Sequence, residues 1–171
     1  MPRRSEPAPI RIEFRPELRA RGRELVSGGC AGLEVHAGSF LRERRIVLDS
    51  ALLEQPRELA RILTHEVYHF VWRRLGNTVR RSYEELLQSE LRQRRRGELG
   101  DSSERRKSGL AREDILGRSR RWREYVCESF CDTAAWLAAG GRHSEFTLDP
   151  EARRKRRAWF GHVRTQFRIQ L

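Results

Sequence analysis

Residues 63–71, LTHEVYHFV, carry the most specific chemical signal in this chain of 171 residues. An HExxH run on a helix places its two histidines, His65 and His69, on one face one turn apart. Both can then bind one zinc ion, while Glu66 between them reaches a zinc-activated water as general base. The alternative is a pair of ordinary helix histidines beside a solvated glutamate. We favour the metal site, and the sequence therefore predicts zinc (Zn2+) as the cofactor.

The residues around this motif predict a continuous helix. Pro56 suits the first turn of a helix, and Gly76 suits a left-handed stop after the last turn. Apolar residues recur between them at the three- and four-residue spacing of a packed helix: Leu59, Ile62, Leu63, Val67, Phe70 and Val71.

A zinc ion held by two histidines needs a third protein ligand, and a catalytic site leaves the fourth position to water. Glu128 is our candidate. It lies in a predicted helix from about Ser119 to Ala139. Helical geometry places Tyr125, Glu128 and Asp132 on one side of this helix. The alternative is that these carboxylates form the wet face of an amphipathic helix, and the nearby HExxH run favours the ligand.

HExxH on one helix and ExxxD on a later one resembles the gluzincin metalloproteases, the thermolysin-like clan, and more loosely the small single-domain bacterial zincin-like proteins that include the ImmA/IrrE-type enzymes. The resemblance covers residues 63–71 and 125–132. It implies an α+β zincin-like domain and a peptidase in which the zinc ligands are His65, His69 and Glu128 and the general base is Glu66. It also implies that Asp132 orients one histidine, since a ligating histidine usually donates its other ring N–H to a carboxylate.

Other candidates complete the predicted site. Hydrolysis needs a donor that stabilises the negatively charged tetrahedral intermediate, and Tyr125 or His143 could supply it. Each also has a plain alternative, as a buried tyrosine or a surface histidine. The separation between His69 and Glu128 is longer than the compact thermolysin-like spacing. Weaker candidates for the third ligand therefore remain: Glu84, Glu85, Glu113 and Asp114.

Length and composition favour a single zincin-like domain over residues 1–171, located in the cytoplasm. The chain is too short for two comfortable domains, shows no apolar run of membrane-spanning length, and lacks the apolar core of a signal peptide at its arginine-rich start. Cys127 and Cys131 are predicted to be small buried thiols. A CxxxC metal site is the alternative, and it would compete with Glu128 for the same turn of helix.

The formal charge of +12 could reflect a nucleic-acid partner, but all but two of the 36 basic residues are arginine. So uneven a ratio is also what a proteome-wide preference for arginine gives. Solvated helix faces are the more common explanation of such clusters. The expected partner is thus a peptide or protein substrate. The alternatives are a catalytically weak, zinc-retaining binding or regulatory module, and a basic nucleic-acid-associated protein.

The rest of the chain predicts an α+β fold with a small N-terminal sheet. Strands are expected at residues 10–14, 33–37 and 39–48, the last two joined near Gly38, and a short helix at 16–26. Ser82 begins a capping box, which predicts a helix from there to about Gly97. A polar insertion, loosely packed, is expected at about 97–117, and a last helix from Pro150 to about Phe167.

Overall fold

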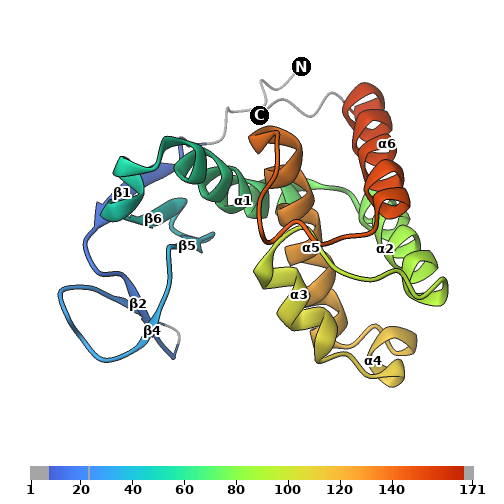
Figure 1. The fold of residues 1–171 in the computed structure, drawn as a ribbon, viewed down its shortest axis with the longest axis horizontal. Coiled ribbons are helices and arrows are strands. Elements are labelled where there is room, and N and C mark those ends of the chain that lie inside the picture. Colours follow the sequence, from blue (N-terminus) through green and yellow to red (C-terminus); the bar gives the residue numbers. More distant parts are fainter. Residues whose placement is uncertain (1–7, 23, 168–171) are drawn as a thin grey trace, which may run out of the picture. The chain divides into compact units, whose positions relative to one another are not determined.

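The structure is a computed structural model that describes residues 8–22 and 24–167, with side chains to residue 163. Its strands are β1 (Arg11–Arg15), β2 (Arg19–Arg21), β3 (Glu24–Val26), β4 (Leu33–Glu34), β5 (Ala37–Phe40) and β6 (Arg45–Asp49). Its helices are the 3-10 helix η1 (Ser50–Glu54), α1 (Pro56–Arg74), α2 (Asn77–Arg92), α3 (Asp101–Ser108), α4 (Arg112–Leu116), α5 (Arg120–Ala139) and α6 (Pro150–Phe167). The predicted α+β class is confirmed (Figure 1).

The chain divides into two compact units, and the boundary lies inside α1, between Val67 and Tyr68. The first unit holds two three-stranded sheets, with strand orders β1-β6-β5 and β3-β2-β4. β6 is the central strand of its sheet, parallel to β1 and antiparallel to β5. Its residues 46–48 are fully buried, as expected for the apolar run of a central strand. The edge strand β5 is therefore held in register by a rigid neighbour.

The prediction of a helix at residues 16–26 is wrong. This segment forms β2 and β3, which pair antiparallel across a turn at Gly22, where φ is +63°. Arginine and leucine favour helix locally, but pairing of β2 with the distant strand β4 overrides that preference. Gly38 is not a turn either. It lies inside β5, where an added Cβ would come within 2.7 Å of Leu25, and the β5–β6 turn falls at residues 41–44.

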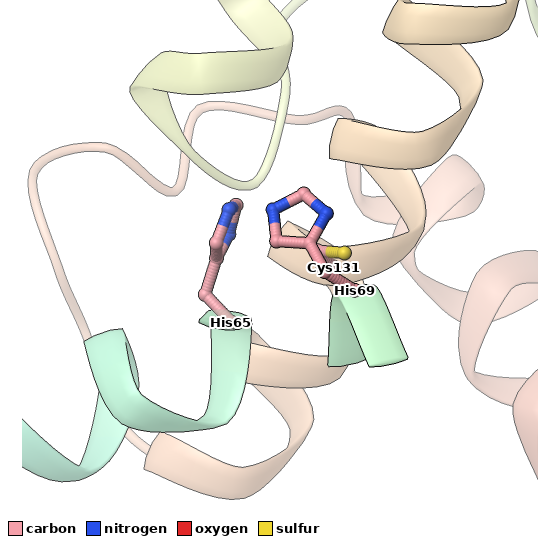
Figure 2. Close-up of side chains that lie close together, drawn as sticks. All are labelled: His65, His69 and Cys131. Atoms are coloured by element: carbon pink, nitrogen blue, oxygen red, sulfur yellow. The ribbon is translucent and has the colours of Figure 1, made fainter. Parts of the chain in front are cut away.

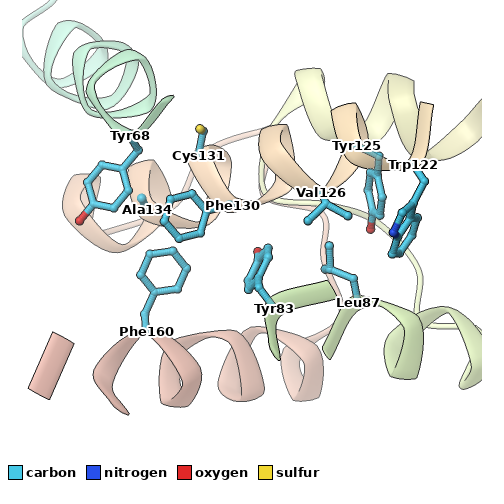
Figure 3. Close-up of a cluster of buried hydrophobic side chains, with 10 residues drawn as sticks. All are labelled: Tyr68, Tyr83, Leu87, Trp122, Tyr125, Val126, Phe130, Cys131, Ala134 and Phe160. Carbon is cyan, nitrogen blue, oxygen red and sulfur yellow. The ribbon is translucent and has the colours of Figure 1, made fainter. Parts of the chain in front are cut away.

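The second unit is helical, and α5 is its central element, contacting α2, α3, α4 and α6. A cluster of aromatic and aliphatic side chains fills the space around α5 (Figure 3). Phe130 of α5 stacks on Phe160 of α6 with ring centroids 5.1 Å apart, and Tyr83 of α2 meets Phe130 edge to face. Burial of these rings on one side of α5 fixes which residues lie on its other sides.

The predicted helices around the HExxH motif, at 119–139 and at 150–167 are confirmed as α1, α5 and α6. The predicted start of the next helix at Ser82 is wrong, because α2 begins at Asn77. The Ser82 hydroxyl donates to the Val79 carbonyl at 2.8 Å within α2 rather than capping it. Of the helices in the described part of the chain, none is long and apolar enough to cross a membrane.

Residues 97–117 are not a loosely packed insertion. They contain α3 and α4, and α3 packs along α5. Glu98, Leu99 and Ser103 have no solvent exposure. The low apolar content of this segment misled the prediction, because its buried positions are largely polar and hydrogen-bonded instead of apolar.

A buried ion cluster accounts for much of that polarity. The guanidinium of Arg156, on α6, donates to both carboxylate oxygens of Glu90 and of Glu98, with the shortest contact to each at 2.7 Å. The Tyr125 hydroxyl donates to Glu98 at 2.6 Å, and the Lys107 ammonium lies 3.2 Å from the same carboxylate. Two cations thus balance two anions in the interior, which is the condition for burying charge.

We predict that Glu98→Gln destabilises the protein by about 3–5 kcal/mol at neutral pH, since it leaves Arg156 buried without full charge compensation. Burial would raise the pKa of Glu98, but the charge and hydrogen bonds of Arg156 outweigh it and hold this pKa below its ordinary value of 4.5. The carboxylate therefore stabilises the fold above pH 4.5, and this contribution is lost as pH falls through the lowered pKa.

Urea unfolding of wild type and variant across this pH range measures the difference directly. The gap between the two proteins should be constant above pH 4.5 and shrink in more acidic solution. The exposed Glu104→Gln is the matched control and should change stability by less than about 0.5 kcal/mol. A gap that stays constant into strong acid would contradict the assigned role of Glu98.

Candidate metal centre

The continuous helix α1 positions both histidines of the motif. His65 and His69 lie one turn apart, so their separation is set by the helix itself. Both side chains are partly exposed, whereas Glu66 between them is 8% exposed. The predicted juxtaposition of two imidazoles is thus present.

The third side chain of this group is Cys131 of α5. One ligand atom from each of His65, His69 and Cys131 lies within 4.8 Å of the others (Figure 2). Zinc bound tetrahedrally to nitrogen and sulfur holds its ligand atoms roughly 3.3–3.8 Å apart, given bonds of about 2.0–2.3 Å. Small side-chain rotations would bring these three atoms to that spacing. Two imidazoles and a thiol are also donors that zinc prefers, so the residues present fit the ion.

Cys127 contacts the other nitrogen of His69. Its Sγ lies 3.5 Å from His69 Nδ1, so a metal would bind this ring through Nε2, the nitrogen that lies 4.0 Å from Glu128 Oε2. The hydrogen bond with Cys131, and after it the hydrogen bond and charge of His69, outweigh burial and together lower the pKa of the Cys127 thiol to about 6. Burial raises the pKa of Cys131 well above its ordinary value. Cys127 therefore occupies the position of a group that fixes the tautomer and orientation of a ligating histidine.

Glu128 lies beside the histidines but is also held by a cation. Its Oε2 is 4.0 Å from His69 Nε2, and its Oε1 is 3.4 Å from the guanidinium of Arg106 on α3. The predicted ligand is thus close to one histidine. It does not belong to the group of three formed with both histidines, where Cys131 takes that place.

Asp132 serves the N-terminus of α3. Its Oδ2 accepts the backbone N–H of Ser103 at 3.0 Å, and its whole side chain is buried. The residue at the start of α3, Gly100, has no side chain to cap the helix, so Asp132 of α5 supplies the missing acceptor. A Cβ on Gly100 would approach this carboxylate to 2.3 Å, which explains the glycine. The histidine-orienting role stays a prediction.

Glu66 is hydrogen-bonded to the edge strand of the sheet in the first unit. The Ser39 hydroxyl, on β5, lies 2.5 Å from Glu66 Oε2 and 3.1 Å from the Glu66 carbonyl oxygen. This contact holds one carboxylate oxygen in place and leaves Oε1 as the oxygen that can take up a proton. Sequence reasoning did not single out Ser39, because nothing in the strand pattern distinguishes it from an ordinary strand serine.

The two predicted oxyanion donors lie in different surroundings. The Tyr125 hydroxyl donates a hydrogen bond to Glu98 inside the buried ion cluster. Burial raises the pKa of Tyr125 well above its ordinary value. His143 lies in the loop after α5, where its Nδ1 accepts the backbone N–H of Glu145 at 3.3 Å and its ring lies tilted against Phe146 with the ring centroids 5.3 Å apart. His143 is partly exposed, whereas Tyr125 is buried and bonded to Glu98.

The weaker ligand candidates have other partners or lie on the surface. Glu84 makes a two-point ion pair with Arg118, and Asp114 accepts from the backbone of Ala111 and the hydroxyl of Ser119. Glu85 and Glu113 are exposed. Within the described residues, none of these four joins a group of three metal-ligating side chains.

Comparison with known proteins gives no match at the level of family models, curated proteins or solved structures.

We predict that Cys131→Ser lowers the affinity for zinc far more than Glu128→Gln does, because it removes the sulfur ligand that lies close to both histidines. Cobalt(II) substitution gives a separate test. Wild type and Glu128→Gln should show a sulfur-to-metal charge-transfer absorption, and Cys131→Ser should lack it. Zinc affinity that is unchanged in Cys131→Ser but lost in Glu128→Gln would return the third ligand to Glu128.

Proposed function

We propose that this chain is a zinc-dependent peptidase in which His65, His69 and a third residue of α5 hold the ion. The close group of two imidazoles and one thiol is the observation that carries the proposal, and it favours Cys131 as that residue over the sequence-based candidate Glu128. The same helix that presents the histidines presents a glutamate between them, and this arrangement is typical of zinc hydrolases.

When bound, zinc would polarise a substrate carbonyl and lower the pKa of water towards about 7. The role of the protein's own residues is then to transfer a proton at a fixed position. Glu66 takes the proton from the attacking water and delivers it to the leaving amine. Ser39 is a positioning residue in this scheme, because its hydrogen bond to Glu66 Oε2 restrains the carboxylate. A base held in its reactive orientation lowers the activation barrier, because the entropy of positioning it is not lost during the reaction.

A peptide is favoured as substrate by the strand that carries Ser39. β5 is an edge strand, and among residues 8–22 and 24–167 it pairs only with β6. An extended peptide can add to such an edge through backbone hydrogen bonds. Because Ser39 connects this strand to Glu66, a peptide paired with β5 would lie near the base. This supports a zincin-like arrangement of strand and helix.

One observation favours a second candidate function, a zinc-retaining module without turnover. Cys127 lies at 3.5 Å from His69, and the low pKa of its thiol suits a metal ligand. If the ion bound His69 through Nδ1, the nitrogen that faces Cys127, then Cys127 could join His65, His69 and Cys131, and the site would hold four protein ligands, the composition of closed structural zinc sites. No position would then remain for water.

We predict that purified protein binds one zinc per chain and that Glu66→Gln keeps the zinc while losing hydrolysis by about 10²- to 10⁴-fold, the usual contribution of a general base. Turnover of a peptide library, with metal content measured on the same samples, makes the test. Ser39→Ala should lower kcat by a smaller factor with little effect on KM or on zinc content.

The control is Glu54→Gln, which changes an exposed glutamate of η1 and should leave both quantities unaltered. Normal turnover by Glu66→Gln would rule out its role as base. A wild type that holds zinc but cleaves no peptide would favour the closed site, and Cys127→Ser would then weaken zinc binding as strongly as Cys131→Ser does.

A further inference from the structure

A second site lies within the helical unit, in a cavity of about 260 Å³ lined mainly by arginine. Its walls come from the end of α1, the first turns of α2, the segment between α4 and α5, and the first turn of α5. The lining residues are Trp72, Asn77, Arg80, Arg81, Glu84, Arg118 and Arg123. None of them belongs to the candidate metal centre, and the proposed peptidase activity uses none of them.

Two of the four arginines have structural partners. The Arg118 guanidinium makes two hydrogen bonds of 2.8 Å to Glu84, which is 7% exposed. Arg80 donates to the carbonyl oxygens of Trp72 and Arg73 at the C-terminus of α1, where a cation is stabilised. These contacts hold the two guanidinium groups at fixed places in the wall of the cavity.

The other two arginines, Arg81 and Arg123, have no ion pair and no side-chain hydrogen bond to any residue in the described part of the chain. Glu84 is the one acidic residue of the lining, and Arg118 neutralises it. The cavity therefore carries a net positive charge, and the guanidinium groups of Arg81 and Arg123 can donate to a ligand. Four arginines thus share this lining with one carboxylate.

We propose that this cavity binds a phosphomonoester group. Two free guanidinium groups match the double negative charge of a phosphomonoester, and their planar N–H pairs suit its oxygens. The N-terminus of the 16-residue helix α2 adds to this, since Gly76 provides no side-chain cap and Asn77 lines the cavity. The volume is slightly below the range of about 300–1,000 Å³ usual for drug-sized ligands, so a small terminal group fits better than an internal stretch of nucleic acid.

Calorimetric titration of the 171-residue chain with inorganic phosphate at fixed ionic strength tests the proposal. We expect saturable binding with one site per chain. The double variant Arg81→Gln/Arg123→Gln should weaken it at least about tenfold, since each removed arginine takes away charge-assisted hydrogen bonds. The matched control Arg92→Gln/Arg121→Gln removes the same charge from exposed positions of α2 and α5 outside the cavity, and should weaken binding by less than about threefold.

Further ligands identify the source of the phosphate group and its chemical class. AMP binding more tightly than phosphate would indicate a nucleotide, and a phosphoserine peptide binding more tightly would indicate a phosphorylated protein. Both outcomes support the site. Dimethyl phosphate, a singly charged diester, should bind at least about tenfold more weakly than phosphate. Equal binding of the diester, equal weakening by both double variants, or no saturable binding of phosphate would overturn the proposal.

Discussion

The buried guanidinium of Arg156 is the constraint on which the helical unit depends. It has no solvent exposure and binds Glu90 of α2 and Glu98 of the segment before α3, while Tyr125 of α5 donates to the same Glu98. Four parts of the chain far apart in sequence thus meet at one charge cluster. An unpaired charge is costly in the interior, so each partner must be in place for the others to remain buried. Such a cluster specifies one arrangement of helices, whereas apolar packing alone tolerates small shifts.

The orientation of α5 follows from that cluster and from the aromatic core. Phe130 faces the rings of α2 and α6, and Tyr125 faces the ion cluster, so Cys127 and Cys131 are left to face His69. Asp132 then reaches the N-terminus of α3. Different sides of α5 therefore contact the aromatic core, the N-terminus of α3 and the candidate metal centre. This division explains why almost every residue from 125 to 136 is buried or partly buried.

The sequence was sufficient to predict helices that local caps and apolar spacing define. It was insufficient where the rotation of a helix about its axis, or the pairing of strands, determines the structure. The HExxH helix, α5 and α6 were predictable because their caps and apolar spacing are local. The choice between Glu128 and Cys131 was not, since both lie near the same face of α5 and only the packing of Phe130 and Tyr125 fixes its rotation. The helix predicted at 16–26 failed because β2 pairs with the neighbouring β3 on one side and with β4 on the other, and this sheet pairing overrides local helix propensity. Residues 97–117 were misjudged because a buried ion cluster has the composition of a solvated segment.

In the proposed peptidase, the hydrogen bond between Ser39 and Glu66 would make the alignment of two strands matter for catalysis. Ser39 pairs with Ile46 across the β5–β6 ladder, and neighbouring residues of a strand point to opposite faces of the sheet. A slip of β5 by one residue would keep the ladder but turn the hydroxyl to the other face. The length of the turn at residues 41–44 sets this alignment. A one-residue insertion or deletion in that turn would therefore remove the hydrogen bond to Glu66 without changing the helix that carries it, so the length of a surface turn controls a contact made elsewhere in the fold.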